Sequence, residues 1–327
     1  MNKFYKRLTV LFLLIAGISA AVVYYTVDIH TLKSLNVFRP WSLVAALLLL
    51  ALGMYFDGTR LMHLVRISGE RISLYQGVQV IFSNYFLAVL TPGAAGGAVA
   101  QVMFLRRAGV PTGKATVVVL VRTILSILFL LVCQPLIFFY DPGLVPWISE
   151  RTLVAASTLL IAGIVAGIWL FRTRIPNYLL IRLTKKLQPD RRRRIFLVYR
   201  DVRGAVFLLA SAPGSMLRVF VESAASLVAM YSMVPVLFMG IGAAFNWWII
   251  LGRMIFLNVI LYFAPTPGGS GVAEGGFVLL FGNFLPPGTV GILAVAWRIL
   301  AEYLPFSIGL YFTVKTFGRD FITRELK

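Results

Sequence analysis

Two arginines lie inside long apolar stretches of the sequence, where a charged side chain is unusual. Arg122 follows Gly113 by nine residues and Arg298 follows Gly288 by ten, so each lies well within the apolar run that begins there. A guanidinium group binds phosphate or carboxylate through two parallel hydrogen bonds and stays protonated at any physiological pH. A buried pair of arginines therefore indicates recognition of an anionic group.

Acidic residues accompany the second arginine. Glu302 lies four residues after Arg298, so the two can pair on one helix face, and Glu274 follows the glycine-rich segment upstream. These carboxylates either hold helices together, or position the arginines and carry a coupling proton. Arg253 is a further candidate binding residue, although for it and for Glu222 a structural or interfacial role is the simpler interpretation. A charge in hydrocarbon costs at least about 2.5 kcal/mol, so each of them must face protein or water.

Two proline- and glycine-rich segments, at 91–97 and 265–271, interrupt the apolar stretches 74–105 and 244–285. Proline and glycine end a helix there, and the helices that restart point their N-terminal N–H groups at one centre, which favours an anion. We interpret each stretch as a re-entrant helical hairpin with a buried tip. Two ordinary spans joined by a loop, or tips that serve only close packing, are the alternatives. The candidate binding residues at the tips are Pro92, Gly93, Gly96, Gly97, Pro265, Pro267, Gly268, Gly269 and Gly271.

The composition indicates which elements position these residues. The 327 residues are 59% hydrophobic and 13% charged, whereas a soluble domain carries about 25% charged residues. This excludes a soluble enzyme, and the single cysteine, Cys133, excludes an intrachain disulfide. We predict an all-α polytopic membrane protein with two opposed re-entrant hairpins and six full spans, the first a signal anchor rather than a cleaved signal peptide. The predicted spans are 8–27, 41–57, 115–140, 151–171, 217–239 and 289–316.

The basic residues predict the orientation in the membrane. There are 31 Lys and Arg against 12 Asp and Glu, and twelve of the basic residues lie in 172–218 with two acidic residues. The loop at 172–216, between the spans at 151–171 and 217–239, is therefore predicted to be cytoplasmic, as are both basic termini of this multi-pass cell-membrane protein. The arginine run at 191–194 indicates adhesion to an anionic leaflet. Nucleic acid is not an expected partner, because no recognition module is present.

The two halves of the chain resemble each other. Thr-Pro-Gly at 91–93 precedes Arg122, with 31 residues from Thr91, and Thr-Pro-Gly at 266–268 precedes Arg298, with 32 residues from Thr266. Each half has the order span, span, broken hairpin, long span, and the predicted topology inverts one half relative to the other. Inverted repeats with paired broken helices are typical of transporters. We predict one transmembrane domain whose repeats cover about 8–140 and 151–316.

These segments resemble the flippase-like integral membrane family known from the transmembrane region of lysylphosphatidylglycerol synthases. The closer match is 265–274, followed by Trp297, Arg298 and Gly309; the weaker is 91–97, followed by 106–109 and Arg122. Many members carry Glu and Arg where this sequence has Ala98 and Gln101. The resemblance covers about 40–316. With no soluble aminoacyl-transfer domain expected, it implies the lipid-moving activity of the family without the lipid-modifying one.

Together these features predict translocation of an anionic lipid headgroup, on a phospholipid or a polyprenyl phosphate, between the leaflets. Arg122 and Arg298 would hold the phosphate, the tips would line the path, and no cofactor, metal or ATP hydrolysis is expected. The expected partners are the lipid and the bilayer. Two other classes stay open: a membrane-embedded glycosyl or aminoacyl transferase, and a non-catalytic partner of a lipid-modifying enzyme. A small soluble anion would suit the arginines almost as well.

Overall fold

The computed structural model describes residues 38–325, apart from 92, 147, 172, 174, 186, 187 and 287. The predicted first span at 8–27 lies outside the described residues. The described elements are all helical. They are α3 (Pro40–Ile67), α4 (Leu74–Val89), α5 (Ala95–Arg107), α6 (Thr112–Tyr140), η2 (Pro142–Leu144), α7 (Glu150–Phe171), α8 (Ile175–Thr184), α9 (Pro189–Ser211), α10 (Pro213–Tyr231), α11 (Met233–Ile241), α12 (Trp247–Tyr262), α13 (Val272–Phe281), η3 (Gly282–Phe284), α14 (Thr289–Arg298), η4 (Ile299–Tyr303) and α15 (Leu304–Glu325).

Five helical segments are long and apolar enough to cross a membrane, and they coincide with five of the predicted spans. The segment predicted at 41–57 is longer than expected, because α3 continues to Ile67. Asp57, at the end of the predicted span, and Arg60, in its continuation, are buried inside the protein and therefore do not end the helix at a membrane surface. The five segments are Pro40–Ile67, Thr112–Tyr140, Glu150–Gly167, Pro213–Ile241 and Thr289–Phe317.

Small residues set the closest helix contacts in the body of the molecule. A Cβ on Gly309 of α15 would lie 2.0 Å from the carbonyl oxygen of Phe82 in α4. Gly53 of α3 similarly meets α10, where the Ser226 hydroxyl donates a 2.8 Å hydrogen bond to the Gly53 carbonyl. Such contacts let two backbones approach without a side chain between them, as is common among membrane helices.

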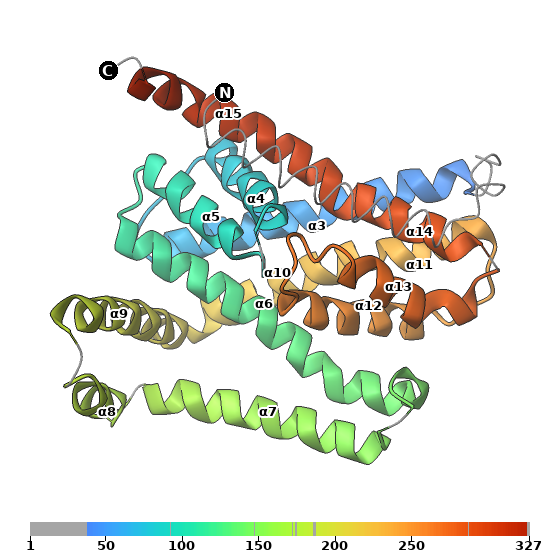
Figure 1. Cartoon of the computed structure of the whole chain (residues 1–327), viewed down its shortest axis with the longest axis horizontal. Helices are drawn as coiled ribbons and strands as arrows, with labels where there is room; N and C mark the ends of the chain where they lie inside the picture. Colours follow the sequence, from blue (N-terminus) through green and yellow to red (C-terminus); the bar gives the residue numbers. More distant parts are fainter. Residues whose placement is uncertain are drawn as a thin grey trace.

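The two broken stretches form helix–turn–helix hairpins, α4 with α5 and α12 with α13 (Figure 1). The first hairpin starts after a short connection whose Glu70 pairs at 2.6 Å with Lys114, at the start of α6. The second hairpin starts near the other end of α6, because Arg253 of α12 pairs with Asp141, which follows the last residue of α6. The starts of the two hairpins therefore lie near opposite ends of the same long helix.

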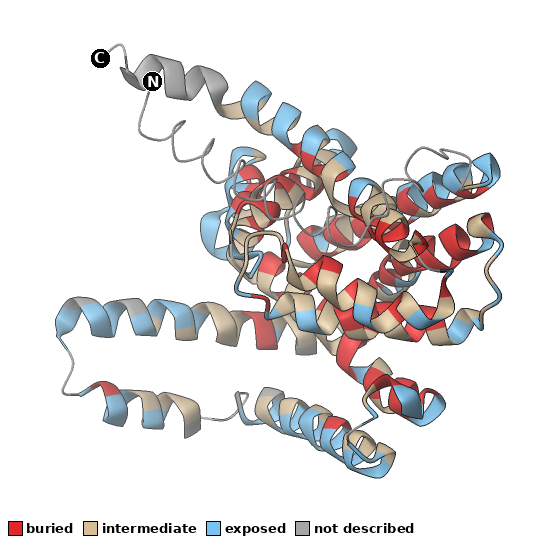
Figure 2. Cartoon of the chain, turned by 45° about the vertical axis from the view of Figure 1, so that its right-hand side comes forward, coloured by how far each residue is buried: buried red, intermediate tan, exposed pale blue. Residues whose placement is uncertain are grey.

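Helices α7, α8 and α9 form an arm on one side of the body (Figure 1). Most residues of α7 are exposed, although Ser157 is buried, and α8 and α9 mix exposed with half-buried residues (Figure 2). The basic segment predicted as a loop is helical, with α9 starting at Pro189, a residue suited to the first helical turn. Gly204 of α9 packs on α6, since a Cβ there would lie 3.1 Å from Val117.

Candidate functional site

The tips of the two hairpins touch each other. The Gly93 N–H donates to the carbonyl of Ala264 at 3.1 Å, and a Cβ on Gly268 would lie 3.1 Å from the carbonyl oxygen of Val89. Gly93 and Gly268 have φ angles of +60° and +57°, a left-handed conformation that glycine adopts readily. Both tips therefore depend on glycine for the turn, and Gly268 depends on it for the contact as well. Pro92 of the first tip lies outside the described residues.

Side chains of the hairpins take up part of the N–H groups at the tips. The Thr91 hydroxyl accepts a 2.8 Å hydrogen bond from the Gly96 N–H and donates one to the Leu87 carbonyl. The Glu274 carboxylate accepts a 2.8 Å hydrogen bond from the Gly271 N–H, at the start of α13. The helix N-termini that the sequence analysis assigned to an anion are thus engaged, in part, with side chains of the protein itself.

The other tip residues lie at the turns. Gly97 packs so closely on α4 that a Cβ would lie 2.4 Å from the Asn84 side-chain oxygen. Pro265, Pro267 and Gly269 belong to the turn between α12 and α13, where Gly269 faces Leu261. Apart from Pro92, the tip residues predicted from the sequence therefore lie in the contact between the hairpins or in the turns next to it.

Arg122 belongs to a buried ion cluster with Asp57 and Arg60 of α3. One oxygen of Asp57 pairs with Arg122 and the other with Arg60, the latter at 2.5 Å. Asp57 is 2% exposed and Arg122 is 7% exposed. We name Asp57, Arg60 and Arg122 the first cluster; its two guanidinium groups and one carboxylate leave one formal positive charge in excess.

Neutral polar side chains connect the first cluster to the first hairpin. Arg122 donates at 2.6 Å to the side-chain oxygen of Gln101 in α5, and the Gln101 amide donates at 2.8 Å to Asn84 in α4. Arg60 donates at 2.8 Å to the Ser126 hydroxyl of α6. Gln101 stands where the resembling family commonly has Arg, and its side-chain amide oxygen binds Arg122. The carboxylate that pairs with Arg122 belongs to Asp57 of α3.

Arg298 belongs to a second buried cluster with Glu274 and Glu302. It pairs with Glu302, which confirms the predicted contact one helical turn apart, and its Nε lies 3.2 Å from a carboxylate oxygen of Glu274. It also donates at 2.9 Å to the carbonyl of Gly268, at the tip contact. Arg298 is 1% exposed. This second cluster, Arg298, Glu274 and Glu302, has one formal negative charge in excess.

A π-helical turn follows Arg298 directly. Residues Ile299–Tyr303 form η4, which interrupts the long span between α14 and α15 and contains Glu302. The Tyr303 ring lies 5.5 Å from the Arg298 guanidinium carbon. π-Helical turns are rare and occur frequently at functional sites, since they displace side chains from ordinary helical register.

Arg253 and Glu222 lie in other ion pairs. Arg253 donates to both oxygens of Asp141, at 2.6 and 3.0 Å, and thereby joins α12 to the end of α6. A carboxylate oxygen of Glu222 in α10 lies 2.8 Å from Nδ1 of His63 in α3, and Glu222 also pairs with Arg218 at 3.2 Å. The structure therefore brings Arg298, Glu274, Glu302 and the second tip together, places Arg122 with the first hairpin, and gives Arg253 different partners.

Sequence reasoning missed Asp57 and Arg60. A pattern that could have predicted their pairing was present in the sequence. The two residues are three apart and follow an apolar run without a break, so they can pair on one helix face. The predicted span at 41–57 ends at Asp57 and leaves Arg60 outside it. What was not visible is that α3 continues past them, which places both side chains inside the protein.

Five apolar helical segments and buried ion clusters define the class: an all-α polytopic membrane protein. Residues 10–309 match the family described as the lysylphosphatidylglycerol synthase TM region, and the chain belongs to that family. The chain is also 22% identical, over 250 residues, to a UPF0104 membrane protein of Archaeoglobus fulgidus, an alignment that covers 74% of this chain and 76% of that protein. The family relation implies a membrane function related to lipids.

Proposed function

We propose that the protein moves an anionic lipid headgroup between the two leaflets, without a cofactor and without hydrolysing ATP. One observation carries the proposal: two hairpin tips touch, and each hairpin contacts an arginine that is buried against carboxylates. A charge costs free energy to bury, so a membrane protein that keeps such groups inside commonly uses them along a substrate path.

The headgroup phosphate replaces a carboxylate in this scheme. Arg122 binds the phosphate in place of Asp57, which stays paired with Arg60, so that no carboxylate is left without a cation. Arg298 exchanges Glu302 for the phosphate in the same way, and protonation of Glu302 removes the excess negative charge of the second cluster. The positive first cluster attracts the anion and the negative second cluster helps to release it.

A buried hydroxyl at the second tip adds a donor for the headgroup. The Thr266 side-chain oxygen is buried and has no hydrogen-bond partner among the described residues. Buried polar atoms are nearly always paired, so an unpaired one next to a proposed path is a candidate ligand contact. Its counterpart in the sequence of the first half, Thr91, is instead bonded within its hairpin.

The hairpins supply the path. We propose that they are re-entrant, that they enter from opposite membrane faces as halves of an inverted repeat, and that the described contact of Gly93 with Ala264 is a closed state. Separation of the tips on one side at a time exposes Arg122 or Arg298 to one leaflet. Both termini and the basic arm face the cytoplasm in this arrangement, because lysine and arginine concentrate on that side.

Proteoliposomes test the proposal. The full chain is reconstituted with a trace of fluorescent phosphatidylglycerol, and a membrane-impermeant reductant bleaches the outer leaflet. We expect nearly complete bleaching with the wild-type protein. Two charge-neutral double variants, Asp57→Asn with Arg122→Gln and Arg298→Gln with Glu302→Gln, should bleach the inner half at least about tenfold more slowly, because they lose the bidentate phosphate ligand while the formal charge of each cluster stays the same.

Lys114→Ala is the matched control, since it removes an exposed charge outside both clusters, and it should behave as wild type. The assay is repeated with cardiolipin and a polyprenyl phosphate. Wild-type protein that leaves half of every probe protected contradicts the proposed translocation. Folded double variants that flip at the wild-type rate remove the arginines from the mechanism.

A further inference from the structure

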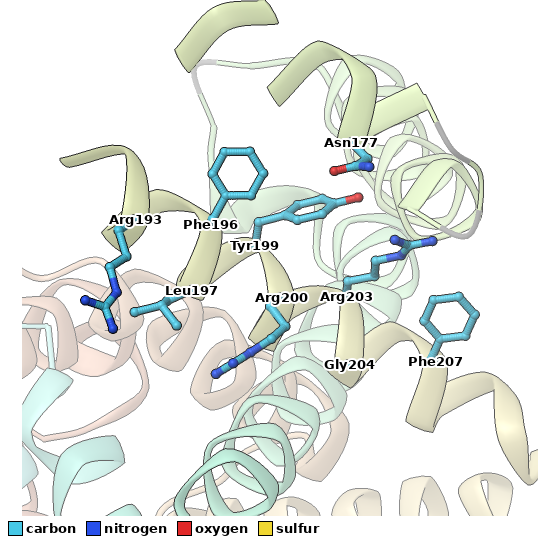
Figure 3. A pocket seen from close by; sticks show the side chains of 9 residues that line it. All are labelled: Asn177, Arg193, Phe196, Leu197, Tyr199, Arg200, Arg203, Gly204 and Phe207. Carbon is cyan, nitrogen blue, oxygen red and sulfur yellow. The ribbon is translucent and has the colours of Figure 1, made fainter. Parts of the chain in front are cut away.

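A groove of about 580 Å³ lies in the basic arm, separate from both ion clusters. Helix α8 contributes Asn177, and α9 contributes the other lining residues. Figure 3 shows Arg193 and Arg200 with Leu197 between them, and Asn177 opposite Tyr199 and Arg203. The lining residues are Asn177, Arg193, Phe196, Leu197, Tyr199, Arg200, Arg203, Gly204 and Phe207.

The residues of α9 that line the groove share one helix face. Spacings of three and four residues connect them along the helix from Arg193 to Phe207, so arginines lie among apolar and aromatic side chains on that face. Three are arginines, and none of the nine described lining residues is acidic. The pairing of Arg200 with Asp201 is an exposed contact at 3.3 Å, which contributes little.

The groove lies on the side of the molecule where several apolar spans begin or end, which is where a membrane surface is expected. Arm helix α7 ends a span, α10 begins one directly after α9, and Gly204 packs near the start of α6. Three of the apolar spans thus begin or end on this side. Helix α8, which contributes Asn177 to the groove, also carries exposed apolar side chains, among them Leu179, Ile181 and Leu183.

We infer that this groove binds the phosphate-bearing headgroup of an anionic phospholipid from the leaflet at this surface. The arginines hold the phosphate through charge-assisted hydrogen bonds, and the aromatic and leucine side chains lie against the glycerol and upper acyl chain. Arg203 lies over the Phe207 ring, with the guanidinium carbon 5.3 Å from the ring centre, so a cation and an aromatic side chain are adjacent in the groove. Apolar residues beside the arginines favour a lipid over a free phosphate.

The inference does not depend on the proposed transport activity, and its test measures binding. Full-length protein is placed in nanodiscs of phosphatidylcholine with increasing fractions of phosphatidylglycerol that carries a diazirine in one acyl chain. After photolysis, labelled peptides are quantified by mass spectrometry. We expect saturable labelling of peptides from 175–211, and little labelling with the corresponding phosphatidylcholine probe.

The decisive comparison uses two triple variants that remove the same charge. The groove variant is Arg193→Gln, Arg200→Gln and Arg203→Gln. The control variant is Arg182→Gln, Lys185→Gln and Arg191→Gln, which changes basic residues of the same arm that do not line the groove. The half-saturating probe fraction should rise at least about tenfold more in the groove variant than in the control.

Equal effects of the two variants would show that surface charge alone attracts the lipid, and would overturn the inference. Equal labelling by the phosphatidylcholine probe would overturn it as well, because the net negative charge of the headgroup would then be irrelevant. Millimolar glycerol phosphate is added in a further arm. Failure to displace the probe supports a lipid site, whereas full displacement identifies a soluble-anion site and contradicts the proposal. Circular dichroism verifies that both variants keep their helices.

Discussion

At the scale of single residues, the protein keeps its central arginines paired with carboxylates. Arg122 and Arg298 are both nearly inaccessible, and each contacts a carboxylate from within the body. A paired buried charge is tolerated, whereas removal of one partner leaves a charge that nothing compensates. The loss of stability should be largest at Asp57, because its single carboxylate pairs with two guanidinium groups.

We predict that Asp57→Asn destabilises the protein strongly. Two buried arginines lose their shared carboxylate, and loss of one partner of a buried pair typically costs about 3–5 kcal/mol. The apparent melting temperature in detergent measures this, with a thiol-reactive dye that reports exposure of the partly buried Cys133. Adding Arg122→Gln to Asp57→Asn should restore part of the loss. Equal melting temperatures for wild type and Asp57→Asn would show that the first cluster contributes nothing to stability.

At the scale of elements, the hairpins are positioned by the helices behind them. Helix α4 is held by α5 and by α15, whose Gly309 lies against the Phe82 backbone. Phe86 of α4 and Phe306 of α15 add a ring contact at 5.3 Å. This close crossing joins the first hairpin to the long span that carries Arg298.

We predict that Gly309→Ala disrupts this crossing. The added methyl would lie 2.0 Å from a backbone oxygen, so the two helices must separate. The expected effects are a lower melting temperature and slower headgroup flipping. Gly163→Ala on α7 is the matched control, because a Cβ there meets nothing within 4 Å and alanine favours a helix by about 1 kcal/mol over glycine. Two variants with the same melting temperature would contradict the close contact.

At the scale of the whole molecule, the starts of the hairpins lie near opposite ends of α6 while their tips meet. Lys114 near the start of α6 contacts the connection before α4, and Asp141 beyond its end holds Arg253 of α12. If α6 spans the membrane, α4 and α12 start at opposite faces. This is the arrangement that the proposed inverted repeat requires.

Cysteine labelling measures the orientation. In a Cys133→Ser background, single cysteines replace Tyr75 at the start of α4, Trp248 at the start of α12, and Lys185 in the basic arm. All three positions are exposed. We expect a membrane-impermeant maleimide to label the Trp248→Cys variant in intact cells, and to label the other two after permeabilisation. Labelling of Tyr75→Cys and Trp248→Cys from the same face contradicts opposed hairpins.

Hydropathy and local spacing determined much of what the sequence shows about this protein. Five described spans, both helix breaks and the pairing of Arg298 with Glu302 followed from the sequence, because a span needs a run of apolar residues and the pair is one turn apart. The residues at 265–274 and 91–97 also resembled the family to which the chain belongs.

The partners of the central groups were decided by the tertiary structure. Asp57 reaches Arg122 across 65 residues of sequence, and Gly93 meets Ala264 across the two hairpins. The basic connection became helices α8 and α9, which together build a groove. Hydropathy cannot foresee such contacts, because helices in a bilayer are apolar on the faces toward lipid and toward protein alike. Which faces meet depends on close packing and on where each buried charge finds its partner.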